Sequence, residues 1–416
     1  MLIDYENVTI LLPKGFSELY VEIIIEVIMM TLTKAENKTL LQLLEEVPDH
    51  RKGNAIKYSL RDVLFLGIFA ILCGADTYTG MSTFCELHYE ELKKYLELPR
   101  GIPSHDVFGD IFSRVDKKAV SKCFQMFVET IRIEEGGDYV VSLDGKTIRK
   151  SGNGEHRAFH IETAYLSDLE IVLGQVEIND KNNELSAIPQ LLEMLCLTEC
   201  TVTIDAMGTH RDFAKQIIDK KGDYIFQVKE NQSKLLADIK LYADVEVLTA
   251  DKKALAENGQ YAVTEEKGHG RKEKRECYVL GEVSWLGDEH NWPGLKGAAL
   301  IISTRTDIKT GKTSIEYRYY IYSHKEMTAE RFLSLQRKHW KIENNLHWCL
   351  DCCFNEDNMH VRMGHAAVII NMFRKLCMQM LRADTSVKDS LAGKRQRCAW
   401  SFDYALSVVK HWVPGS

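Results

Sequence analysis

The first part of the chain, residues 33–135, has apolar positions that recur with the period of an α-helix. Ser59 and Asp62 form a capping-box signature ahead of the apolar run 63–73, and Ser104 begins a further segment of the same kind. The pattern predicts an all-helical domain at 33–135. Short helices joined by tight turns favour a DNA-reading role, and a helical scaffold or dimer surface is the alternative.

The pattern changes at about residue 136 to short apolar runs separated by turn residues, with helical segments between the later runs. The predicted elements are strands at 139–143, 159–166 and 171–178, a helix at 184–195, a strand at 201–204, a helix at 210–220, a strand at 224–228 and a helix at 232–242. Three hairpin-like strands followed by helix, strand, helix and strand is the order of an RNase H-like sheet. A doubly wound sheet would alternate from the start. We therefore predict an α/β fold whose RNase H-like catalytic core begins with residues 136–244.

The remaining segments complete the predicted organisation. Residues 245–325 form a β-rich insertion, with candidate strands at 261–264, 276–283, 298–304 and 314–323. Residues 326–385 return to the core as helices, the first capped by Thr328 and running through Trp340 to about Leu350. Residues 386–416 are a C-terminal tail. Residues 1–32 are an N-terminal extension, and a natural start at Met30 is an open alternative.

Composition limits the function classes. A net charge of −7 and a pI of about 6.1 argue against a protein that coats nucleic acid generally. They leave room for a DNA enzyme, because phosphate binding needs only a local basic surface. The eleven cysteines follow no recognisable secretory signal, which predicts reduced thiols and a cytoplasmic protein, nucleoid-associated when bound to DNA. The apolar stretch 21–30 contains Glu22 and Glu26 and is too short to span a membrane.

Two aspartates end predicted strands of the core. Asp144 and Asp205 each follow an apolar run, so neighbouring strands of one sheet could hold them at the same edge. Phosphoryl transfer on DNA requires two divalent cations roughly 4 Å apart, and hard cations prefer carboxylate oxygens. Aspartates at strand ends are also common as turn formers, and that alternative stays open for either residue alone.

A third carboxylate lies in the segment RKHWKIENNLHWCLDCCFNED. Glu343, His347 and Asp351 are spaced i, i+4 and i+8, which places them on one helical face. A carboxylate on an inward-facing helix beside aromatic residues suits a metal ligand, and His347 and Asp351 are candidate accessory residues. A buried ion pair or a solvated acidic face is the alternative for this helix.

The strings SLDGKTIRKS, TIDAMGTHRDFAKQIIDKKGDYIFQVKENQ and RKHWKIENNLHW…LDCCFNED resemble insertion-sequence DDE transposases of the H-repeat-associated group. The segment VPDHRKGNAIKYSLRDVLFLGIFAILCGADTY resembles the helical domain that precedes the catalytic domain there. The resemblance implies catalytic, metal-binding roles for Asp144, Asp205 and Glu343. It also implies two Mg²⁺ ions, with Mn²⁺ as a substitute, and a homodimer acting on double-stranded DNA at terminal inverted repeats and target sites.

The sequence departs from the related hairpin-forming enzymes at three positions. Their pattern Y-x2-R-x3-E-x6-K around the catalytic glutamate is replaced here by Gln336, His339 and Leu350. Formation of hairpin ends is therefore open. Other basic residues of the segment could supply the phosphate contacts, namely Arg337, Lys338 and Lys341.

Further basic and polar residues are candidates for DNA contact. The set comprises Lys146, Arg149 and Lys150 after the first aspartate, Lys229 and Asn231 after a strand, and Arg271, Lys272, Lys274 and Arg275 in the basic loop KGHGRKEKR. A solvated turn is the alternative for the first group, and a solvated hairpin is the alternative for the basic loop. A zinc site at the CxxC of Cys349 and Cys352 lacks a second paired element, so core thiols are the commoner outcome.

Two functions compete with an active transposase. One is a catalytically inactive, DNA-binding remnant of a mobile element, which the three carboxylates argue against. The other is a general RNase H-like nuclease, which would need neither a helical N-terminal domain nor a β-rich insertion.

Overall fold

The computed structural model describes residues 2–5, 8–11, 39–52, 56–128, 137–152, 157–178, 184–249, 251–268, 270–280 and 283–411. The alternative start at Met30 lies outside these residues. Near the N-terminus, β1 (Leu2–Tyr5) and β2 (Val8–Leu11) form a small antiparallel pair. Within the described part of the chain, no helix is long and apolar enough to cross a membrane.

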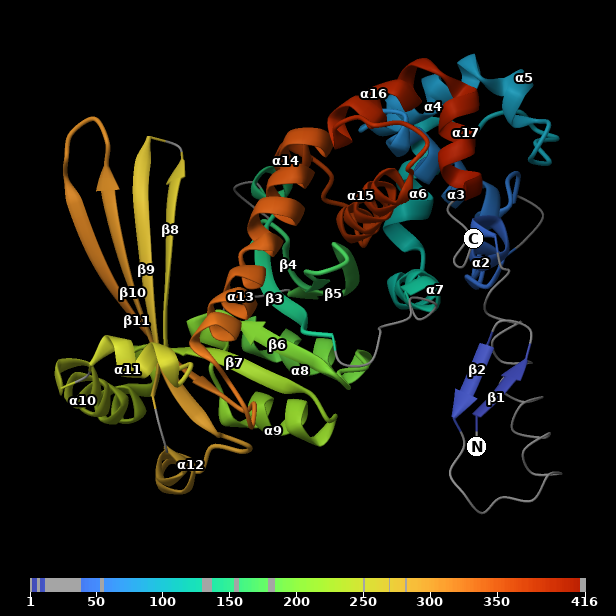
Figure 1. Cartoon of the computed structure of the whole chain (residues 1–416). Coiled ribbons are helices and arrows are strands. Elements are labelled where there is room, and N and C mark those ends of the chain that lie inside the picture. The colour runs from blue at the N-terminus through green and yellow to red at the C-terminus, as the bar shows by residue number, and fades with distance from the viewer. Residues whose placement is uncertain are drawn as a thin grey trace, which may run out of the picture.

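A helical body forms around α3, which is buried along almost its whole length. The Ser59 hydroxyl accepts a hydrogen bond from the Asp62 backbone at 3.0 Å and begins this helix. Its C-terminal carbonyl, Ile71 O, accepts from Arg395 at 2.8 Å, a favourable place for a cation. The helices of this body are α2 (Leu40–Glu45), α3 (Leu60–Leu72), α4 (Tyr78–Leu87), α5 (Tyr89–Leu92), α6 (His105–Arg114), α7 (Lys117–Val128), α15 (Ala366–Ala383), α16 (Leu391–Trp400) and α17 (Phe402–His411). The predicted tail thus contains two helices that pack beside the earliest helices of the chain (Figure 1).

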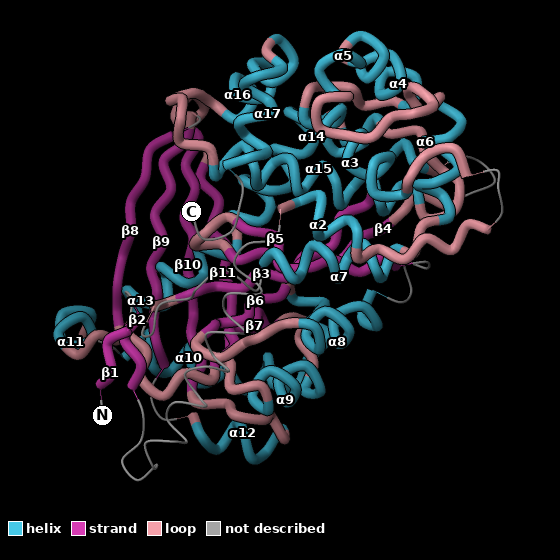
Figure 2. Tube along the Cα trace, turned by 90° about the vertical axis from the view of Figure 1, so that its right-hand side faces the viewer, coloured by secondary structure: helices cyan, strands magenta, loops and turns pink. Residues whose placement is uncertain are grey.

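Nine strands of the described residues form one sheet, in the order β5-β4-β3-β6-β7-β11-β10-β9-β8. Their bounds are β3 (Tyr139–Thr147), β4 (His160–Leu166), β5 (Ile171–Ile178), β6 (Cys200–Ile204), β7 (Asp223–Val228), β8 (Tyr261–Gly268), β9 (Arg271–Leu280), β10 (Gly297–Asp307) and β11 (Thr313–Tyr322). β3, β6 and β7 are parallel, and the other neighbouring strands are antiparallel. Figure 2 shows the strands side by side, with helices above and below them in that view.

Helices cover both faces of this sheet. One apolar layer is built with α8 (Glu184–Met194), α9 (Arg211–Asp219), α10 (Ser233–Thr249) and α12 (Ser284–His290), with the short α11 (Lys252–Glu257) beside it. On the other face lies α13 (Ala329–His339), whose buried side chains pack on β8 to β11. The chain then continues as the π-helix η5 (Ile342–His347) and as α14 (Trp348–Phe354), where the sequence pattern had predicted one uninterrupted α-helix.

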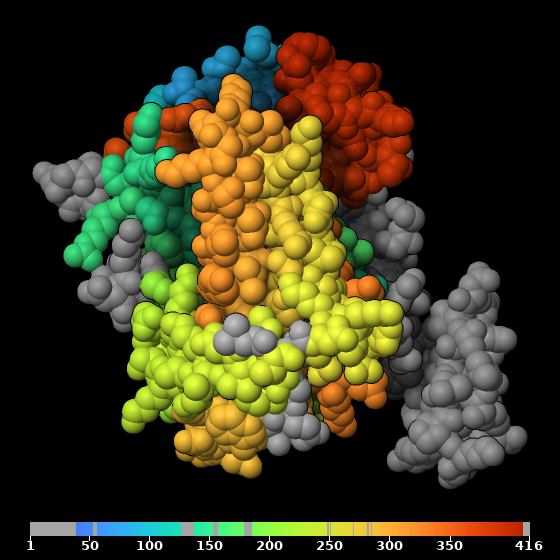
Figure 3. Space-filling view, turned by 60° about the vertical axis from the view of Figure 1, so that its left-hand side comes forward, coloured from blue at the N-terminus to red at the C-terminus, as the bar shows by residue number. Residues whose placement is uncertain are grey.

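The four strands β8 to β11 form an arm that projects from the sheet. β11 pairs with β7 through Tyr319 and Val228, so the β-rich segment continues the central sheet instead of forming a separate one. Figure 3 shows the outer face of the arm as a tall ridge above α10 and α11. The basic run lies in a β-hairpin, the alternative left open for it, because Lys267 and Lys272 pair across β8 and β9.

Candidate active site and basic cleft

Asp144 and Asp205 lie at adjacent positions on neighbouring parallel strands. The register of β3 and β6 pairs Leu143 with Ile204, so the next residue on each strand is one of the two aspartates. The prediction that Asp144 ends its strand is wrong, because β3 continues beside β4 to Thr147 and Asp144 lies inside it. The Asp205 carboxylate accepts a hydrogen bond from the Gly208 backbone at 3.1 Å, which fixes it at the start of a 3-10 turn.

Glu343 comes from a segment much later in the chain that packs against β3. It belongs to the π-helix η5, which contacts β3. Burial and the nearby negative charge of Asp144 raise the pKa of Glu343. π-helical turns are rare and occur frequently at functional sites, because the extra residue redirects side chains. The structure therefore brings the charge of Glu343 close to that of Asp144.

A buried polar layer lies beneath the carboxylates. His339, at the end of α13, shares a hydrogen bond between its Nδ1 and the Thr203 hydroxyl at 3.0 Å. Thr203 in turn donates to the Ser142 hydroxyl at 3.3 Å. Burial lowers the pKa of His339, although the charges of Asp144 and Asp205 oppose this shift. This residue, which the family pattern marked only as a departure, supports the floor of the site.

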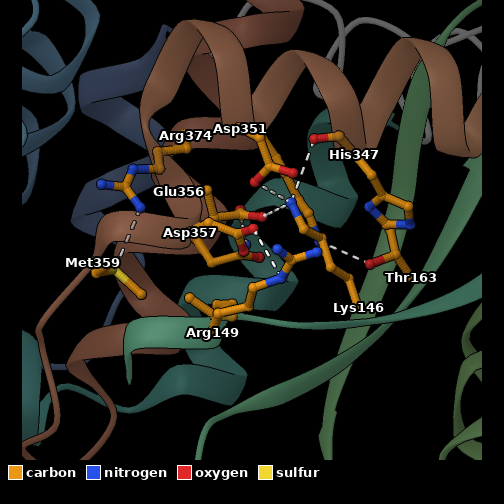
Figure 4. A network of polar contacts seen from close by, with 12 residues as sticks. Lys146, Arg149, Thr163, His347, Asp351, Glu356, Asp357, Met359 and Arg374 are labelled. Atoms are coloured by element: carbon orange, nitrogen blue, oxygen red, sulfur yellow. Dashed lines mark hydrogen bonds and ion pairs between the residues drawn. The ribbon is translucent and has the colours of Figure 1, made fainter. Parts of the chain in front are cut away.

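The two predicted accessory residues both contact β3. His347 Nε2 lies 3.1 Å from Asp144 Oδ2, and Asp351 Oδ1 lies 2.5 Å from Lys146 Nζ. Alternation along β3 places Asp144 and Lys146 on the same face, which is the face that η5 and α14 cover. Figure 4 shows His347, Asp351 and Glu356 converging around Lys146.

The donor set fits a hard divalent cation. Carboxylates in β3, directly after β6 and in η5 offer the oxygen atoms that such a cation prefers. Burial raises the pKa of Glu343, and the negative charge of Asp144, which a cation would offset, raises it further. The ligand atoms of the three carboxylates are spread more widely than 4.8 Å. Among the described residues, a three-ligand group within that limit is formed by Asp238, Glu289 and His290, which lie on α10 and α12.

The CxxC segment does not form a zinc site within the described part of the chain. Cys349 and Cys352 do not come together with His347, Cys353 or His360 as three ligand atoms within 4.8 Å. Cys352 is exposed, and burial raises the pKa of both Cys349 and Cys353. A helical position separates the thiols along the helix, and a raised pKa disfavours the thiolate that binds zinc.

A cleft of about 520 Å³ opens beside Glu343, between α13 and the inner face of the arm. Of the described residues that line it, seven are basic and two are acidic. The basic residues are Arg271, Arg275, Arg305, Arg318, Arg337, Lys338 and Lys341, and the acidic residues are Glu273 and Glu343. We call this feature the basic cleft. Its charge is opposite in sign to that of the whole chain, and it provides the local basic surface that a phosphate backbone requires.

The predicted DNA contacts divide into two groups. Five line the basic cleft: Arg271, Arg275, Arg337, Lys338 and Lys341. The others lie outside the cleft. Lys272 is exposed, and Lys274 and Arg149 form ion pairs with Glu276 and Asp357. Lys150 donates a hydrogen bond to Asn358, and Asn231 donates one to the Ala206 carbonyl. Lys229 is exposed next to Val228 and lies near Glu316 of the arm. Lys146 is half-buried and forms ion pairs with Asp351 and Glu356, so its predicted phosphate contact stays a prediction.

Strand geometry corrects the treatment of the basic run as one patch. Because β9 is a strand, successive side chains point to opposite faces of the arm. Arg271 and Arg275 face the basic cleft, whereas Lys272 and Lys274 face the outer side. The four basic residues of this run therefore form two pairs, one facing the basic cleft and one facing the outer side of the arm.

Sequence reasoning missed two basic residues that line the basic cleft. Arg305 lies on β10 and Arg318 on β11, and each reaches the cleft through the register of the arm. Arg318 lies over the Trp340 ring at 5.5 Å from its centroid. Alternation along a strand shows which of its residues share a face, but the sequence does not say which strands pair. The place of Arg305 and Arg318 in the cleft therefore follows only from the fold.

Comparison with known proteins finds transposase families and relatives along most of the chain. Residues 135–380 match the family model described as "Transposase DDE domain", and residues 41–128 match "DDE_Tnp_1-associated". The chain is 36% identical over 378 residues to "Putative transposase YncI" of Escherichia coli O157:H7, covering 89% of this chain and 94% of that protein.

It is also 34% identical over 379 residues to "H repeat-associated putative transposase YhhI" of Escherichia coli K12, covering 90% of this chain and 98% of that one. A cryo-EM structure of a piggyBac transposase synaptic complex with hairpin DNA has a TM-score of 0.43 and 11% identity, covering 92% of this chain and 80% of that chain. The family matches and the full-length relatives confirm the resemblance stated from the motifs: the chain belongs to the DDE transposases of the H-repeat-associated group.

Proposed function

We propose that this transposase cleaves DNA at the terminal inverted repeats of an insertion sequence and joins the ends to target DNA. The observations that support the proposal are the adjacent positions of Asp144 and Asp205 on neighbouring strands, the closeness of Glu343 to the charge of Asp144, and the basic cleft beside Glu343. Carboxylates that gather negative charge next to a positively charged groove suit a phosphodiester held against metal ions.

The core is proposed to be RNase H-like. Support comes from the strand order β5-β4-β3-β6-β7, in which three antiparallel strands precede two parallel ones. In this interpretation residues 136–244 and 326–385 are the two parts of the catalytic core, and 245–325 contribute the arm. Residues 33–135 are the helical domain, for which contact with DNA remains our proposal.

Asp144, Asp205 and Glu343 would hold two Mg²⁺ ions, with Mn²⁺ as a substitute. Such ions supply an activated water or 3′ hydroxyl and a stabilised leaving oxygen. The protein's own part is to orient the three carboxylates: Asp205 by its turn, Asp144 by His347, and Glu343 by the π-helix. Rigid orientation matters because displacements of about 1 Å at such sites cost large factors in rate.

The basic cleft is proposed to hold the phosphate backbone that leads to the scissile bond. Arg337, Lys338 and Lys341 share its wall with Glu343, so a strand lying there would pass the carboxylates. We propose that a homodimer brings two DNA ends together and that the protein acts in the bacterial cytoplasm at the nucleoid. The absence of the tyrosine, arginine and lysine pattern leaves hairpin ends outside the proposal.

A reaction with purified protein tests this function against its rivals. DNA carrying the inverted repeats that flank the gene, incubated with Mg²⁺ and a target plasmid, should give nicked ends and joined products. A catalytically inactive remnant would bind the ends and give neither product. A general nuclease would cut unrelated duplex at a similar rate and give no joined product. Chelation of Mg²⁺ should stop both steps.

A further inference from the structure

The segment LDCCFNED follows Glu343 in the chain, and the proposed chemistry assigns it no role. Two of its acidic residues, Asp351 and Glu356, meet at Lys146 of β3. The Lys146 ammonium lies 2.5 Å from Asp351 Oδ1 and 2.8 Å from Glu356 Oε2, and it donates to the His347 carbonyl at 3.3 Å. We call these four residues the Lys146 cluster (Figure 4).

The Lys146 cluster is largely shielded from water. The Glu356 side chain is 1% exposed and the Lys146 side chain 15% exposed. A buried carboxylate is costly unless it is paired, so Glu356 requires the lysine. Burial lowers the pKa of Lys146, but the charges and hydrogen bonds of Glu356 and Asp351 outweigh it and leave that pKa raised. The ammonium is therefore charged and engaged by three oxygens, in the arrangement expected of a structural contact.

The cluster joins β3 to η5 and α14 by polar contacts. Lys146 lies two residues after Asp144 on the same face of β3, while Asp351 and the His347 carbonyl belong to α14 and η5. The His347 side chain contacts Asp144 in turn. Glu356 accepts a hydrogen bond from Asn371 of α15, so the cluster also reaches the helical body.

We propose that Lys146 is a positioning residue that fixes the helix bearing Glu343 and His347 against β3, and thereby sets the spacing of the metal-binding carboxylates. This inference rests on the proposed function and deepens it. Residues that orient metal ligands typically contribute about 10- to 100-fold to metal affinity or activity. The competing role is direct phosphate binding by Lys146, and the two roles differ in their effect on DNA affinity.

Two variants test the inference. Lys146→Met removes the ammonium, and Asp351→Asn weakens one arm of the cluster while Glu356 still pairs with Lys146. Because Asp351 is 33% exposed, the second variant is expected to fold even where the first does not. Lys341→Met, a lysine of the basic cleft, is the matched control for loss of a phosphate contact, and Lys146→Arg tests rescue by a retained charge.

Each variant is measured in three ways: cleavage rate at saturating DNA, Mn²⁺ affinity by calorimetry, and the salt dependence of DNA-end binding. We expect Lys146→Met and Asp351→Asn to lose about tenfold or more in rate and in Mn²⁺ affinity, with unchanged DNA affinity and salt slope. Lys146→Arg should recover part of both losses. Lys341→Met should instead flatten the log–log salt slope by about 0.9.

Several results would overturn the positioning role. A salt slope for Lys146→Met that falls as it does for Lys341→Met would make Lys146 a phosphate contact. A steeper slope for Asp351→Asn, in which the lysine is partly freed, would do the same. Wild-type Mn²⁺ affinity in both cluster variants would reduce the cluster to a fold support. If the native protein neither cleaves nor joins DNA, the proposed function fails, and the Mn²⁺ titrations still decide the role of Lys146.

Discussion

The basic cleft and the Lys146 cluster flank the same helix and use the same kinds of side chain for different ends. The cleft is open, and seven of its described lining residues are basic against two acidic ones. The cluster is largely shielded from water, and its lysine forms ion pairs with two carboxylates. Unbalanced charge at a wet surface attracts an external polyanion, whereas balanced charge in a dry site holds elements together. The partners of a lysine therefore decide its role more than its distance from a catalytic residue.

The largest expected effect comes from a change that alters neither region. Asp205→Ala should abolish cleavage, a loss of roughly a thousandfold or more, because the proposed site keeps only two of its carboxylates. Folding and DNA binding should persist, since removing a like charge relieves repulsion in the metal-free protein. Cleavage of end-bearing DNA, thermal unfolding and binding are measured together. Cleavage at the wild-type rate with Mg²⁺ would defeat the assignment.

A second prediction contrasts Lys146 with Lys375, a second lysine that is shielded from water. Lys375 is fully buried and donates to the Thr163 hydroxyl and the Gln175 amide oxygen, and burial lowers its pKa to about 7. Unlike Lys146, it has no carboxylate in an ion pair that the structure records. Between about pH 7 and its ordinary pKa of 10.5, the folded protein thus binds fewer protons than the unfolded chain.

In that window the stability of the wild type rises with pH relative to a variant that cannot titrate there. Lys375→Met should therefore gain most over the wild type at pH 7, and this advantage should shrink by roughly 2 kcal/mol by about pH 9. Denaturant unfolding at both pH values measures the difference. An advantage that is independent of pH would mean that Lys375 keeps its proton in the folded state.

The third prediction divides the arm into its two faces. Arg271→Gln with Arg275→Gln should flatten the log–log salt slope of DNA binding by up to about 1.8, the value for two phosphate contacts. Lys272→Gln with Lys274→Gln removes the same charge from the outer face and should leave the slope nearly unchanged. Sequence preference should survive in both. Equal slopes for the two double variants would show that the basic cleft does not track the backbone.

The smallest expected effect is a gain. Glu266 pairs with Arg337 and Arg275, two residues that line the cleft, and the Arg337 hydrogen bond lowers the pKa of Glu266. Glu266→Gln should free Arg337 and remove one of the two ion pairs of Arg275, which also pairs with Glu273. DNA binding should tighten by up to about fivefold, since exposed ion pairs of this kind are weak. Binding measured at two salt concentrations checks this. A weaker complex would mean that Glu266 orients the arginines for DNA.

The sequence predicted what depends on local pattern. The runs that became β3, β6 and β7 were recognisable, and so were Asp144 and Asp205, because strands with short apolar repeats leave a clear signal. Their adjacency was an inference that the parallel register of β3 and β6 now gives directly. The triad's metal binding stays a prediction.

What depends on pairing between distant segments could not be predicted. Nothing local shows that β11 adds to β7, or that Arg305 and Arg318 face the helix bearing Glu343. The ion pairs of Lys146 could not be predicted for the same reason, since its partner Glu356 lies 210 positions later in the chain. Burial and register are properties of the assembled sheet, and they decided each of these cases.

The π-helical turn at η5 has a consequence for insertions and deletions. A π turn is an α-helix that holds one surplus residue. Deleting Asn344 could be absorbed locally by tightening η5 into ordinary α-helix, so that α14 keeps its rotational phase and Asp351 still meets Lys146. A deletion within α13 or α14 has no such reserve and would rotate all that follows by about 100°. The chain therefore has one surplus residue next to Glu343. A deletion there would preserve the fold and change the direction of the proposed catalytic side chain.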